Sequence, residues 1–62
     1  MTAPLKQTVR QETFEQAMMA IANLVHSAND LESIGDTTDA RELREIVGKI
    51  DSFITDMRLR HS

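Results

Sequence analysis

The sequence contains no cysteine, tryptophan or tyrosine, and its 62 residues include only one proline, two glycines and two phenylalanines. Without cysteine, the chain can form neither a disulfide framework nor a thiolate metal site. Domains this small bury only about 60% of the surface of the unfolded chain, so they commonly add a disulfide, a metal or a partner. The histidines, His26 and His61, fall on different predicted elements without a ligand cluster around them. We therefore predict no metal and no cofactor, and association with another chain remains as the means of stabilisation.

Long hydrophobic runs are also missing. No uninterrupted apolar stretch approaches the roughly 18 residues of a membrane span, and the first residues lack the charged-then-apolar pattern of a signal peptide. We therefore expect a cytoplasmic protein that does not contact a membrane. The net charge is only -3, with both signs mixed along the chain. This balance gives no electrostatic footprint for nucleic acid, which argues against a nucleic-acid partner.

Helix-breaking residues are so few that they mark the elements directly. No glycine or proline occurs between residues 5 and 34, which predicts a helix over 8–34 after a flexible lead-in of residues 1–7. Thr8 and Gln11 have the spacing of a capping box at its start. Pro4 leaves open an earlier start, because proline is tolerated in the first turn of a helix. Gly35 then stands where a helix commonly ends on a residue in the left-handed conformation.

The second half of the chain repeats this pattern. Residues 36–38 complete the predicted turn, and Asp39 with Glu42 has the spacing of a second capping box. We predict a second helix over 39–59 within a single domain that covers 8–62. A connection this short makes the two helices antiparallel neighbours.

Apolar residues recur at spacings of three and four on both helices, as in the seam of a helical bundle. Two helices cover only part of such wide stripes, which would expose an apolar strip along the hairpin. The sequence therefore predicts an all-α antiparallel hairpin that dimerises into a four-helix bundle of Rop-like architecture. The predicted core and dimer-interface residues are Phe14, Met18, Ile21, Leu24, Val25, Leu31, Leu43, Ile46, Val47, Ile50, Phe53, Ile54 and Met57.

His26 is the residue of greatest chemical interest. Together with Asn29, three positions later, it resembles the phosphoacceptor box of histidine-kinase dimerisation domains, which are also dimeric helical hairpins. The resemblance implies phosphotransfer on His26. However, Ser27 stands where that family has an acidic residue, and the family's usual proline is absent. We therefore interpret His26 as a surface histidine.

Two strips outside the apolar stripes carry small or adaptable residues where a solvated face usually carries long charged ones. A glycine within a helix costs about 1 kcal/mol relative to alanine, and methionine suits an adaptable binding patch. We interpret both strips as a possible partner surface. Their residues are Met19, Ala22 and His26 on the first helix, and Arg44, Gly48, Asp51 and Thr55 on the second.

The sequence shows no pattern of a catalytic site. It contains no acid pair, no nucleophile with a positioned base and no glycine-rich phosphate loop. A hairpin this thin is also not expected to form a pocket of enzyme size. We predict a non-enzymatic protein-interaction or regulatory module, homodimeric, of the kind found in bacteria and phage.

Two alternatives remain open. The chain length, the glycine at the turn and the acidic mixed-charge surface resemble the small co-chaperones of type III secretion, which implies a heterodimer with another helical protein. The architecture is also similar to that of the Rop-like plasmid copy-number repressors, which implies RNA binding. Such binding would use basic residues on paired first helices, where this chain has only Lys6 and Arg10.

Overall fold

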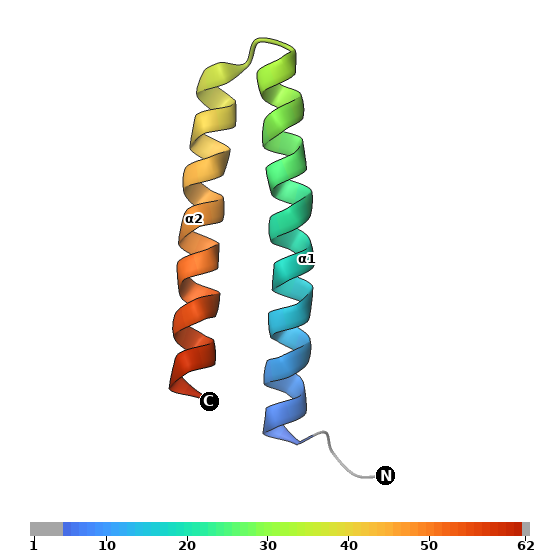
Figure 1. Ribbon diagram of the computed structural model, residues 1–62, viewed down its shortest axis with the longest axis vertical. Coiled ribbons are helices and arrows are strands. Elements are labelled where there is room, and N and C mark those ends of the chain that lie inside the picture. The colour runs from blue at the N-terminus through green and yellow to red at the C-terminus, as the bar shows by residue number, and fades with distance from the viewer. Residues whose placement is uncertain (1–4, 62) are drawn as a thin grey trace.

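The computed structural model describes residues 5–61 as two long antiparallel helices joined by a tight turn (Figure 1). Helix α1 spans Lys6–Ser33 and helix α2 spans Thr37–Arg60. They form a slab of 50 × 24 × 10 Å, which is two helices wide and one helix thick. The predicted all-α hairpin is confirmed. Residues 1–4, which belong to the predicted lead-in, lie outside the described residues, as does residue 62.

The turn ends α1 in the way the sequence predicts. Gly35 has a φ of 93°, in the left-handed region that favours glycine. Its N–H donates to the Glu32 carbonyl at 3.1 Å, and the Asp36 N–H donates to the Leu31 carbonyl at 2.9 Å. This pair of bonds is the Schellman motif, which satisfies carbonyl groups left over at the end of a helix.

Both predicted capping boxes are wrong. The N-cap of α1 is Leu5, and that of α2 is Asp36, neither with a side-chain cap bond. Thr8 therefore lies inside the first turn of α1, and Asp39 lies inside the first turn of α2. Nothing in the residues just before the predicted starts breaks a helix, so each helix continues backwards by two residues. Asp39 instead places a negative charge at the positive end of the α2 dipole.

One seam of side chains holds the two helices together. Its members recur at alternating spacings of three and four residues, the a and d positions of a heptad pattern. Ala28, Ala40, Val47 and Ile54 are buried, and the remaining members are half-buried. The seam consists of Phe14, Ala17, Ile21, Leu24, Ala28 and Leu31 from α1, and of Ala40, Leu43, Val47, Ile50, Ile54 and Met57 from α2.

Candidate interaction surfaces

Four residues of the predicted core stripes are left uncovered by the hairpin. Met18 and Val25 on α1 are each 41% exposed, whereas Ile46 and Phe53 on α2 are 52% and 56% exposed. Each of them neighbours a seam residue in sequence, so it flanks the seam. These four residues are the apolar surface that the hairpin offers to another molecule next to its own core.

The uncovered residues lie on opposite broad faces of the slab. With the seam at heptad positions a and d, Met18 and Val25 occupy e positions, and Ile46 and Phe53 occupy g positions. The e positions of the two helices share a face. Arg44 of α2 and Glu32 of α1 are both e residues, and they form an ion pair with each other. The g positions share the other face. The prediction of a single exposed apolar strip is therefore wrong. The seam buries the middle of each apolar stripe, and the part that stays exposed lies on one broad face for α1 and on the other for α2.

The first broad face, which we call the e face, is crossed by polar contacts between the helices. Arg44 donates a hydrogen bond to Asn29 Oδ1 at 2.9 Å and pairs with the Glu32 carboxylate. Beyond these bonds, Met18 lines a hollow together with Asp51 and Thr55 of α2. The e face thus combines an apolar patch on α1 with charged and small residues on α2.

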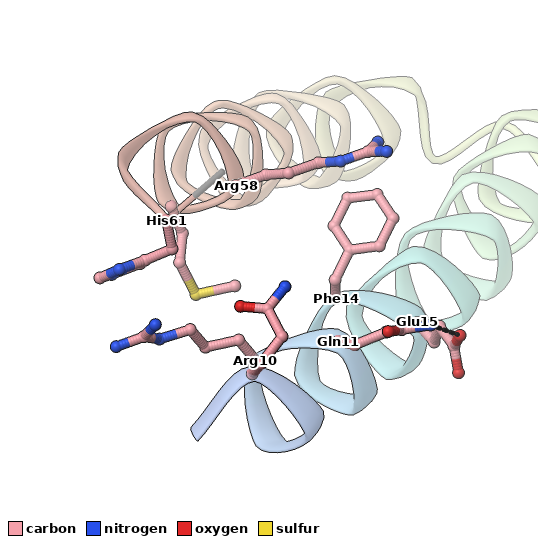
Figure 2. Close-up of a pocket in the computed structure, with 8 residues that line it drawn as sticks. Arg10, Gln11, Phe14, Glu15, Arg58 and His61 are labelled. Atoms are coloured by element: carbon pink, nitrogen blue, oxygen red, sulfur yellow. Dashed lines mark hydrogen bonds between the residues drawn. The ribbon is translucent and has the colours of Figure 1, made fainter. Parts of the chain in front are cut away.

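A pocket of about 400 Å³ lies at the open end of the hairpin, away from the turn. Figure 2 shows Arg58 extending from α2 over Phe14, and Arg10 extending from α1. Gln11 lies along α1 and donates a hydrogen bond to Glu15 Oε1 at 3.4 Å. His61 completes the lining beside Arg10. The pocket therefore places an aromatic ring among cationic groups, amides and the carboxylate of Glu15, which suits contact with another molecule.

The second broad face, which we call the g face, has a different composition on each helix. Its α1 side carries the small, uncharged side chains of Thr13, Ala20 and Ser27 at seven-residue intervals, all exposed. Its α2 side carries four residues at seven-residue intervals, of which the first and the last are charged and the two between them are large and apolar. These residues are Asp39, Ile46, Phe53 and Arg60, which are all exposed.

The structure places the predicted partner strips on different parts of the surface. Met19, Ala22 and His26 are exposed along the outer edge of α1, where His26 Nε2 lies 3.9 Å from Asp30 Oδ2. The strip on α2 borders the e face. Its members are Arg44, Gly48, Asp51 and Thr55, which are all exposed.

The bonds of Arg44 to α1 had no signal in the sequence. They join residues more than ten positions apart, and only the docking of the two helices brings these side chains together. An ideal Cβ placed on Gly48 would meet no atom within 4 Å. The surface beside Gly48 is therefore open to another molecule.

Within residues 5–61, no group of three or more acidic or histidine side chains is placed to hold a metal ion. Neither helix in that range has a stretch sufficiently long and apolar to span a membrane. Comparisons with protein families, with curated proteins and with solved structures find no match for this chain.

Proposed function

We propose that the chain is a small helical interaction module that works as a homodimer and binds or regulates another protein. The observation that carries the proposal is the exposure of Ile46 and Phe53, each more than half exposed on a slab only one helix thick. Burying one large apolar side chain is worth about 1.5–3 kcal/mol. Contiguous apolar surface on a small protein commonly marks an interaction site.

The energetics of the isolated hairpin support this proposal. Only Ala28, Ala40, Val47 and Ile54 are buried among the described residues, and two of these are alanines with little apolar area. Most helical stability in proteins comes from packing of the apolar face rather than from intrinsic helix propensity. A second hairpin on a broad face would convert exposed apolar residues into core and complete a four-helix bundle.

The presence of two unlike broad faces supports a role beyond self-association. A face-to-face dimer covers one broad face of each copy and leaves the other two faces at the outside of the bundle. Met18 and Val25 would then remain exposed beside the strip around Gly48. We assign to this second surface the contact with another protein, in a module with no catalysis of its own.

Sedimentation velocity of the intact chain at micromolar concentration tests the proposal. We expect a compact helical dimer, and a folded monomer at that concentration would contradict it. Co-purification from the native host then tests the second contact. Recovery as a one-to-one heterodimer with another helical protein, in place of a homodimer, would favour the secretion co-chaperone alternative. Recovery with RNA would favour the Rop-like alternative.

A further inference from the structure

The α2 side of the g face carries a sequence of residues that is complementary to itself. Asp39, Ile46, Phe53 and Arg60 follow one another at seven-residue intervals, as an acidic, two apolar and a basic residue. The opposite direction reads basic, apolar, apolar, acidic. Two antiparallel copies of α2 can therefore place Asp39 opposite Arg60 and Ile46 opposite Phe53, each pair occurring twice. We call these four residues the g line.

We propose that a second copy of the chain docks on the g face, with the two g lines antiparallel and the two turns at opposite ends. This inference rests on the proposed function, because it presumes that the chain dimerises. It adds the face, the orientation and the register of the dimer. It also leaves the e face and the strip around Gly48 for another partner.

Exposure and charge on the g line favour this occupant. Ile46 and Phe53 are 52% and 56% exposed, so they have apolar area to lose in a contact. Among residues 5–61, Arg44 pairs with Glu32 and His26 lies within 4 Å of Asp30, and neither contact involves Asp39 or Arg60. Both charges are thus available to a second copy, and oppositely charged ends fix the register of an interface.

The same charges select the orientation. With both turns at one end, the acidic ends of the two g lines would share that end of the bundle. Each Asp39 would then lie about 30 Å along the helix from either Arg60, since a helix rises 1.5 Å per residue. With the turns at opposite ends, Asp39 and Arg60 of different copies meet at both ends of the interface. The orientation with the turns at opposite ends therefore has two attractive contacts, whereas the orientation with both turns at one end brings like charges together.

The rest of the g face is compatible with this contact. Thr13, Ala20 and Ser27 on α1 are small and uncharged, so they allow close approach along the middle of the helix, and the charged Lys6 lies beyond them in the first turn of α1. One broad face of a slab 50 Å by 24 Å has an area on the order of 1,000 Å², against about 800 Å² per partner in a standard interface. Glu42, Lys49 and Asp56 follow one another at seven-residue intervals along the outer margin of the face, where their exposed side chains let the charged groups reach water.

Charge reversal at the two ends of the g line tests the proposal in the intact chain. Asp39→Arg and Arg60→Asp each replace two attractive contacts of the dimer with two repulsive ones. We expect sedimentation to show self-association weakened about tenfold for each variant alone. Mixed in equal amounts, the two variants should form a heterodimer of nearly parental affinity, because each new charge then meets its opposite on the other chain.

Matched controls carry the same charge changes on the outward side of α2. Glu45→Arg and Arg41→Asp alter exposed residues that point away from the g face, and both should self-associate like the parent. The recovery in the mixture also separates an interface effect from a loss of helix stability, since a variant whose own helix is weakened by the substitution would keep that defect in the heterodimer. Phe53→Ala should weaken the dimer without any change of charge.

A cross-linking experiment reads the orientation independently, because the parent chain has no cysteine. Asp39→Cys mixed with Arg60→Cys should be joined by a short bis-maleimide, whereas Asp39→Cys alone should not. Efficient linkage of Asp39→Cys to itself would overturn the proposed orientation. A dimer that no g-line substitution weakens would overturn the proposed interface while leaving the proposed function intact. A monomeric parent would overturn both.

Discussion

The guanidinium group of Arg58 on α2 lies over the aromatic ring of Phe14 on α1, with its central carbon 4.7 Å from the ring centroid. This contact joins the two helices at the open end of the hairpin, where no turn holds them together (Figure 2). The ring is half-buried in the seam, so Arg58 also shields apolar surface with its own stem. The open end is therefore stabilised by one cation–π contact and by the last residues of the seam.

Arg58→Ala should loosen this end. Cation–π contacts at exposed sites are worth about 0.5–1 kcal/mol, and we expect the free energy of unfolding to fall by about that amount in urea denaturation. Arg41→Ala is the matched control, because Arg41 is an exposed arginine on the outward side of the same helix. Equal midpoints for the two variants would show that the contact with Phe14 contributes nothing measurable.

The two glycines should respond oppositely to alanine. Gly35 adopts a φ of 93°, which an L side chain rarely does, so Gly35→Ala should destabilise the hairpin by about 1 kcal/mol. Gly48 lies inside α2 with open space around its Cβ position. Gly48→Ala should therefore stabilise the hairpin by up to about 1 kcal/mol through helix propensity. Thermal melts of both variants against the parent decide the matter, and shifts of the same sign would contradict this account.

The hairpin was predictable because its signals are local. Gly35 carries enough information to end α1, and the three-and-four spacing of apolar residues identifies the seam without any structure. Helix starts are less well encoded here, because the residues before Thr8 and Asp39 continue a helix as readily as they end one. Ala40 is absent from the predicted core, which begins at Leu43 on the second helix, yet it has no exposed surface.

The surfaces were harder to predict because they depend on how the helices dock. Helical periodicity places Met18 and Ile46 on the apolar stripe of their own helix, but it does not say which margin of each stripe the other helix leaves open. The docked pair puts these residues on opposite faces, as the bond from Arg44 to Asn29 across the e face makes evident. The spacing of residues along one helix gives no information about contacts between side chains that are distant in sequence.

Substitutions at two adjacent positions of α2 should have very different effects on stability, because one position lies in the seam and the other on the surface. Ile50 is half-buried in the seam, whereas Lys49 is exposed and lies about 100° away around the helix. Ile50→Asp places a charge among apolar side chains, so it should unfold or dissociate the protein. Lys49→Ala should change the free energy of unfolding by less than about 0.5 kcal/mol. Circular-dichroism melts that move by the same amount for both variants would refute the assignment of the seam.

Binding to another protein should use the two strips that lie off the seam. Gly48 has open space around it, and Met19 is 68% exposed on the outer edge of α1. Gly48→Arg and Met19→Glu should therefore leave the helical content and the dimer intact, while blocking the contact with whatever protein co-purifies from the native host. Quantitative co-purification beside the outward control Glu45→Ala measures this loss, and retention of the partner by both variants would refute it. Transfer of phosphate to His26 by a cognate kinase would contradict it more deeply, because the outer edge of α1 would then be a site of chemistry.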